Sequence, residues 1–140
     1  MRVAATTWRS SVVVLVLAAV VACSAGGTPR GTAATGALLF RGTPALGEGI
    51  AGACSNCHAV AAGQQAGIGP NLSNIGGRAA TAVAGEDASS FLRESILQPD
   101  AHLADNYQEG IMPRTYAQSL SAQQIADLVA YLLTLKSGQD

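Results

Sequence analysis

The sequence has few of the residues that usually bind metals or fill a hydrophobic core. Its 140 residues include three cysteines, two histidines, three tyrosines, two phenylalanines and one tryptophan. Because a small domain buries little surface, one with so few large side chains would gain stability from a bulky apolar ligand at its centre. The composition therefore suggests a cofactor without indicating which one.

Basic residues are also scarce, and this excludes one class of partner. The chain has 8 lysine and arginine residues against 9 acidic ones, and Lys136 is its single lysine. Domains that bind nucleic acid carry clustered lysine and arginine side chains on one face. Since the sequence has no such cluster, we expect no nucleic-acid partner.

An apolar run near the N-terminus is typical of an export signal. Arg2 and Arg9 precede residues 12–22, which are apolar without a break. A helix that spans a membrane needs about 20 apolar residues, so residues 1–22 are predicted to be a cleaved signal peptide. Cleavage would remove both arginines and leave a net charge of about −3.

The end of this run, Val20-Val21-Ala22-Cys23, resembles the lipobox of bacterial lipoproteins, in which cleavage occurs before a cysteine that carries lipid. Secretion with cleavage nearby, or an uncleaved anchor, are the alternatives. Three cysteines in an exported protein leave one unpaired, and lipidation of Cys23 would use it. We therefore expect an extracytoplasmic protein, lipid-anchored to the cell membrane or periplasmic, with residues 23–31 as a flexible tether.

The rest of the chain, residues 32–137, is predicted to form one all-α domain of three to five helices. No segment has the alternating pattern of a strand. The glycine-rich stretches 42–53 and 59–77 are expected to be irregular, and so are residues 99–120. The expected helices, with their capping residues in brackets, are 33–41 (Thr32), 87–98 (Asp87 or Ser89) and 121–135 (Ser121).

Two of the three cysteines and one histidine lie within five positions, as Cys54-Ser55-Asn56-Cys57-His58. This CxxCH spacing is typical of covalent haem attachment, in which both thiols add to the haem vinyl groups and the histidine becomes an axial ligand. A redox disulfide and half of a zinc site are alternatives. Zinc needs four ligands, and a thioredoxin-like motif needs a βαβ unit; the sequence supplies neither. We therefore expect one haem c, bound through Cys54 and Cys57.

The haem iron would need a second axial ligand, and Met112 and His102 are the two strong candidates. Met112 precedes Pro113 in an irregular polar segment, where a methionine is not expected as core filler. His102 lies in a loop near Asp100, where a solvated surface histidine is the ordinary interpretation. We favour Met112, so His58 and Met112 are the predicted metal ligands.

These features occur in the order found in the class I c-type cytochromes, and residues 32–136 resemble that family. The resembling stretches are Gly36 and Phe40 on a first helix, the CxxCH motif, Gly69-Pro70-Asn71-Leu72 followed by Arg78, Met112-Pro113, and residues 128–132 with Tyr131 on the last helix. The resemblance implies a small cytochrome c fold wrapped around one haem. It also implies that the first and last helices cross at Gly36 and that Phe40 packs on Tyr131.

The resemblance further implies roles for residues around the haem. The Pro70 carbonyl would accept the proton on Nδ1 of His58 and so fix the tautomer of the ring. Arg78 would pair with a haem propionate. Tyr107 or Asn106 would also bond to a propionate.

With both axial positions filled, the iron has no vacant position for a substrate. We therefore expect a one-electron carrier of an extracytoplasmic respiratory chain, not an enzyme. Its expected partners are a quinol oxidase or dehydrogenase upstream and a terminal oxidase downstream, and it would act as a monomer. The alternatives are a haem c relay subunit of a larger membrane-associated oxidoreductase complex, and a haem enzyme or gas sensor with a labile second ligand.

Overall fold

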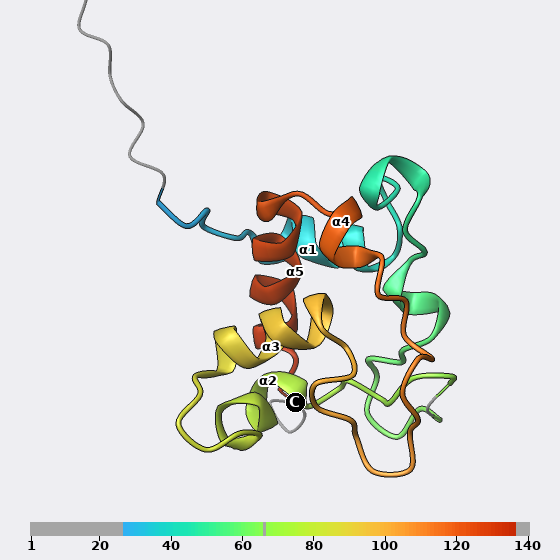
Figure 1. The fold of residues 1–140 in the computed structure, drawn as a ribbon, viewed down its shortest axis with the longest axis vertical. Coiled ribbons are helices and arrows are strands. Elements are labelled where there is room, and N and C mark those ends of the chain that lie inside the picture. Colours follow the sequence, from blue (N-terminus) through green and yellow to red (C-terminus); the bar gives the residue numbers. More distant parts are fainter. Residues whose placement is uncertain (1–26, 66, 137–140) are drawn as a thin grey trace, which may run out of the picture.

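The computed structural model describes residues 27–65 and 67–136 as short helices joined by long loops (Figure 1). Within that part of the chain no strand forms, and the only β pairing is an isolated antiparallel bridge between Leu46 and Ala51. The predicted all-α fold is therefore confirmed. The helices, in chain order, are α1 (Ala33–Phe40), α2 (Ile75–Arg78), α3 (Ala88–Leu97), α4 (Tyr116–Ser119) and α5 (Ala122–Thr134), and single 3-10 turns lie at Gly47–Gly49, Cys54–Asn56 and Ala79–Thr81.

The three long helices lie where the sequence predicts them, but α2 and α4 fall within stretches expected to be irregular. Each of these two helices is one turn of four residues, which is too short to show a helical period. Contacts with distant parts of the chain hold them instead. The Gly76 N–H of α2 donates to the carbonyl of Leu135 at 2.9 Å, and Tyr116 of α4 is buried.

Two of the predicted helix caps form and one does not. Asp87 accepts the N–H groups of Ser89 and Ser90. The bond from the Ser90 hydroxyl, followed by those from the two N–H groups, lowers the pKa of its carboxyl. Ser121 begins α5 with the full capping box. Thr32 occupies the N-cap position of α1, but its side chain makes no capping bond. The prediction for Thr32 was wrong because a distant residue, Asp127 of α5, satisfies this helix end.

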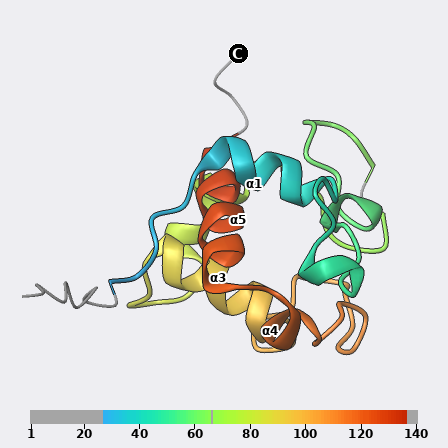
Figure 2. The same cartoon turned by 90° about the horizontal axis from the view of Figure 1, so that it is seen from above.

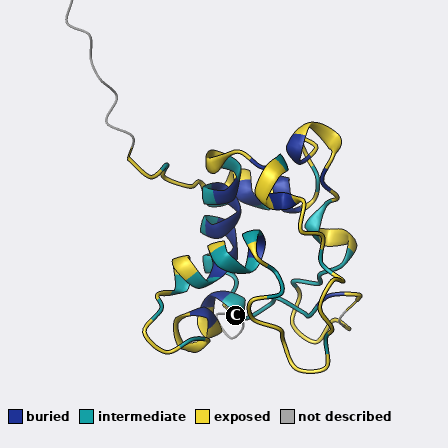
Figure 3. Cartoon of the chain, in the orientation of Figure 1, coloured by how far each residue is buried: buried dark blue, intermediate teal, exposed yellow. Residues whose placement is uncertain are grey.

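The crossing of α1 and α5 is the main part of the core, which also includes buried residues of α3 and α4 (Figure 3). A Cβ built on Gly36 would lie 1.9 Å from the carbonyl oxygen of Asp127, so only glycine permits this approach. The rings of Phe40 and Tyr131 pack with centroids 5.5 Å apart. Both contacts are those that the family resemblance implies. Asp127 is buried at the same crossing, where it accepts the Thr32 N–H at 2.6 Å.

The helices and the long loops occupy different sides of the molecule. Figures 1 and 2 both show α1, α3 and α5 on one side, and the loops 42–74 and 99–115 on the other. The loops therefore provide the second wall of any site that the helices leave open. Within the described chain, no helix has the length and hydropathy needed to cross a membrane.

The predicted signal peptide, residues 1–22, and the predicted lipid site at Cys23 lie outside the described residues. Of the expected tether, residues 27–31 are described and are not helical. The Gln123 side chain donates to the carbonyl of Arg30 at 3.0 Å. The chain is therefore in contact with α5 from Arg30 onward.

Candidate functional site

The CxxCH motif forms a tight turn that directs its three functional side chains to one place. The N–H groups of Cys57 and His58 both donate to the carbonyl of Cys54, at 3.1 Å and 3.0 Å. Because of this turn, Cys54, Cys57 and His58 all line a single cavity of about 430 Å³. The turn thus places two thiols and one imidazole along the edge of the same space.

The imidazole of His58 is held in one orientation. Its Nδ1 lies 2.9 Å from the carbonyl oxygen of Pro70, which can only accept, so Nδ1 carries the proton. This is the hydrogen bond that the family resemblance implies, and it leaves Nε2 of the neutral ring unprotonated and able to bind a metal. Gly69 lies against the ring. A Cβ added at this position would lie only 2.4 Å from Cε1 of His58, so a larger residue would clash with the imidazole.

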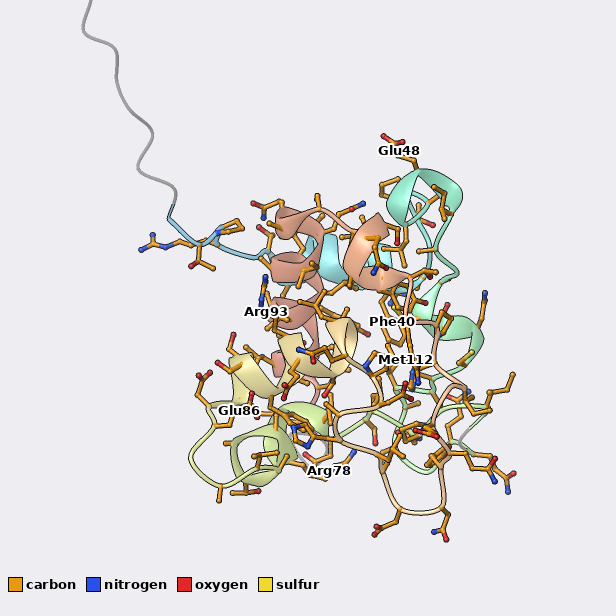
Figure 4. All side chains as sticks on the ribbon, in the orientation of Figure 1. Phe40, Glu48, Arg78, Glu86, Arg93 and Met112 are labelled. Atoms are coloured by element: carbon orange, nitrogen blue, oxygen red, sulfur yellow. The ribbon has the colours of Figure 1, made fainter. Side chains whose placement is uncertain are left out.

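Three further residues singled out from the sequence line this cavity: Arg78, Tyr107 and Met112. Met112 is half-buried and packs against the core, while Arg78 is exposed and donates from Nη2 to the carbonyl of Asn71 at 3.4 Å. Figure 4 shows Met112 near the middle of the molecule and Arg78 toward its lower edge. Of the two residues predicted to bond to a propionate, Tyr107 lines the cavity and Asn106 does not.

His102 also borders the cavity, but its ring already has partners. Its Nε2 lies 2.9 Å from the carboxylate of Glu94, and its ring packs at a tilt against Phe91 with centroids 5.8 Å apart. The residue is exposed. The imidazole is thus held at the surface by α3, as the sequence-based interpretation of a solvated histidine expects.

The zinc and redox-disulfide alternatives do not fit this site. Within residues 27–65 and 67–136, the one group of three converging potential metal ligands is Glu86, Glu94 and His102, so the donor atoms of the CxxCH motif do not meet around a single ion. Burial raises the pKa of the Cys54 thiol to about 11. A redox-active cysteine needs a lowered pKa, since the thiolate is the nucleophile.

The cavity suits a large apolar group with a polar edge. Most of its wall comes from aliphatic and aromatic side chains of the helices and of the loop after the motif, whereas Arg78 and Tyr107 supply polar atoms. The two unpaired thiols and the oriented imidazole lie along the same wall. The main apolar lining residues are Leu72, Ile75, Phe91, Leu92, Ile96 and Leu132.

Sequence reasoning missed two residues that shape the site. Tyr116 is buried, lines the cavity and donates its hydroxyl to the carbonyl of Gly52 at 2.9 Å, and burial raises its pKa to about 12. Asp100 also lines the cavity, and its carboxylate bonds to Gly110 and Arg114. An aromatic residue in a segment otherwise poor in them was a signal for Tyr116. Nothing in the sequence pairs Asp100 with residues ten and fourteen positions away.

Comparison with known proteins identifies the site. A search of curated proteins found no significant match to the chain. The family model "Cytochrome c" matches residues 34–136, a span that includes the CxxCH motif, Met112 and all five helices except the first residue of α1. The chain therefore belongs to the cytochrome c family, carries haem c bound covalently through Cys54 and Cys57, and takes part in electron transfer.

Proposed function

We propose that this cytochrome c is a monohaem one-electron carrier of an extracytoplasmic respiratory chain, with His58 and Met112 as the two axial ligands. The observation that carries the proposal is that both residues line one cavity, with Nε2 of His58 left free by the bond from Nδ1 to Pro70. When bound, the haem supplies one-electron exchange between Fe(II) and Fe(III). The residues of this chain bind the haem and enclose it.

The choice of Met112 over His102 rests on burial and on competing partners. The thioether of Met112 has no strong hydrogen-bonding partner to give up, and the side chain is half-buried against the core. His102 would have to leave the Glu94 carboxylate and its contact with Phe91 before its Nε2 could reach a metal. Met112 is therefore the ligand that needs less rearrangement.

The remaining residues of the site bind and enclose the cofactor. Arg78 and Tyr107 would bond to its carboxylates, which is supported by their position in the lining of the cavity, and the apolar wall would keep water from the metal. Burial of a charged centre in such a wall favours its less charged, reduced form. With His58 and Met112 both holding the iron, the site would leave no position for a substrate and would transfer electrons only.

A spectrum of the purified holoprotein tests this function. The oxidised protein is expected to show the weak near-infrared band of methionine bound to haem iron. Carbon monoxide is expected to leave the spectrum of the reduced protein unchanged, because no axial position is open. A rapid spectral shift with carbon monoxide would contradict the proposal and favour a haem enzyme or a gas sensor.

Partners are expected to meet the protein near the mouth of the cavity. Ile68, Leu103 and Ile111 line the cavity and are 63%, 48% and 52% exposed. With little net charge, long-range electrostatic steering is weak, so contact would depend on these apolar side chains. We propose a quinol oxidase or dehydrogenase as the electron donor, a terminal oxidase as the acceptor, and a monomeric carrier between them.

A lipid on Cys23 would hold the carrier beside such membrane-bound partners and raise its effective concentration. The support for this tether is the sequence of residues 12–23, an apolar run that ends in cysteine. In cells that express the full chain, Cys23→Ser is expected to move the holoprotein from the membrane fraction to the soluble fraction or to stop its processing. Wild-type protein that is already soluble after export would contradict the tether.

A further inference from the structure

Met112 lies near the end of a long loop that has few attachments of its own. This loop, residues 99–115, connects the end of α3 at Leu97 to the start of α4 at Tyr116. Most residues on either side of Met112 are exposed, and Ile111 is 52% exposed. The neighbours of Met112 along the chain therefore contribute little packing to hold it in place.

Hydrogen bonds hold this segment at only a few points. Between residues 108 and 113, the described chain makes a single hydrogen bond, from the Gly110 N–H to Oδ1 of Asp100 at 2.7 Å. Oδ2 of the same carboxylate accepts a second bond, from Nε of Arg114 at 2.5 Å. The Asp100 carboxylate thus accepts both of the hydrogen bonds that connect this segment to the start of the loop.

The two bonds are placed symmetrically about the methionine. Gly110 is two residues before Met112 and Arg114 is two residues after it, so the Asp100 carboxylate closes a clamp across the segment that carries the thioether. Both bonds have an ionised acceptor and one also has an ionised donor, which makes them stronger than neutral hydrogen bonds. The bonds from Gly110 and Arg114 also lower the pKa of the Asp100 carboxyl, so the clamp stays charged at neutral pH.

We propose that Asp100 is a positioning residue, which holds Met112 in the cavity by bonding to the chain on both sides of it. The inference rests on the proposed function, because it assumes that Met112 is the second axial ligand. Displacing the thioether from the metal requires the segment to move outward, and this movement breaks the bonds to Asp100. Removing the carboxylate should therefore make the axial position easier for an outside ligand to take.

Competition with added imidazole tests this role in the purified, oxidised holoprotein. Imidazole displaces the thioether, and loss of the near-infrared band reports its binding. Asp100→Ala is expected to tighten imidazole binding about tenfold, which corresponds to about 1.4 kcal/mol. Asp100→Asn keeps an acceptor for the Gly110 N–H but loses the ion pair with Arg114, so its affinity should lie between those of Asp100→Ala and the wild type.

Glu109→Gln is the matched control. It removes the same charge from the same loop, Glu109 is exposed and does not line the cavity, and its side chain accepts no hydrogen bond within the described part of the chain. Its imidazole affinity should equal that of the wild type. The thermal midpoint of each variant separates the roles, because a merely structural role for Asp100 would lower the midpoint without changing the imidazole affinity.

Two results would overturn the inference, and they are distinct. If the wild type shows the near-infrared band but Asp100→Ala and Asp100→Asn bind imidazole like the wild type, Met112 is the ligand and Asp100 does not position it. If the wild type lacks the band, the proposed ligation fails and the role of Asp100 fails with it. Unfolding of Asp100→Ala alone would leave Asp100→Asn to decide between these results.

Discussion

Gly36→Ala is expected to lower the free energy of unfolding of the holoprotein by about 3 kcal/mol, although alanine is the better helix former. The added Cβ would lie 1.9 Å from the carbonyl oxygen of Asp127 and 2.7 Å from Cβ of Tyr131. Backbone atoms cannot turn aside as a flexible side chain can, so α1 and α5 would have to separate. That separation would also open the packing of Phe40 on Tyr131. Denaturant unfolding followed by circular dichroism measures the change.

Gly52→Ala is the control for this substitution. A Cβ at Gly52 meets no atom within 4 Å, and its backbone has no positive φ. Its free energy of unfolding should therefore stay within about 0.5 kcal/mol of the wild type. Equal stability of Gly36→Ala and Gly52→Ala would show that the helix crossing tolerates a methyl group. It would contradict the conclusion that only glycine permits the close approach at position 36.

Met112→Ala is expected to have the largest effect on redox behaviour. The thioether favours Fe(II), so its loss should lower the reduction potential by an amount on the order of 100 mV. The near-infrared band should disappear, and the reduced protein should gain the ability to bind carbon monoxide at the vacated axial position. Potentiometric titration and the two optical measurements, made on the same holoprotein preparation, check these outcomes.

His102→Ala is the control for Met112→Ala, because it removes the other candidate ligand from the rim of the same cavity. It should break the bond to Glu94 and the packing against Phe91 while leaving the band and the potential close to the wild-type values. The opposite pattern, with the band retained in Met112→Ala and the potential shifted in His102→Ala, would assign the second axial position to His102.

The helices could be predicted from the sequence where local signals were strong. The cap at Asp87 and the capping box at Ser121 are encoded within four residues, and both formed. The start of α1 was also predicted, but its capping interaction was not, because the Thr32 N–H bonds to Asp127, 95 residues away. One-turn helices such as α4 have no period to detect, and packing of Tyr116 against distant residues stabilises them.

The residues of the candidate site also differ in whether local sequence signals could identify them. Spacing alone identified Cys54, Cys57 and His58, because the chemistry of attachment requires these residues to be near one another in sequence. The family pattern added Pro70, and the structure places its carbonyl on Nδ1 of His58. The clamp at Asp100 could not be predicted, since loop geometry decides which N–H and which guanidinium meet a given carboxylate.

The crossing of α1 and α5 also governs when folding can be completed. These helices are the first and last elements of the described domain, and the bond between Thr32 and Asp127 joins residues 95 positions apart. Closing a loop of this length costs conformational entropy, so a contact of such long range slows folding. During synthesis, α1 must therefore wait for α5, and the chain reaches Cys54–His58 long before its two ends can meet. The two cysteines are therefore synthesised before the domain can close. The cavity around them is completed only after α5 has been synthesised, because Leu132 of α5 forms part of its wall.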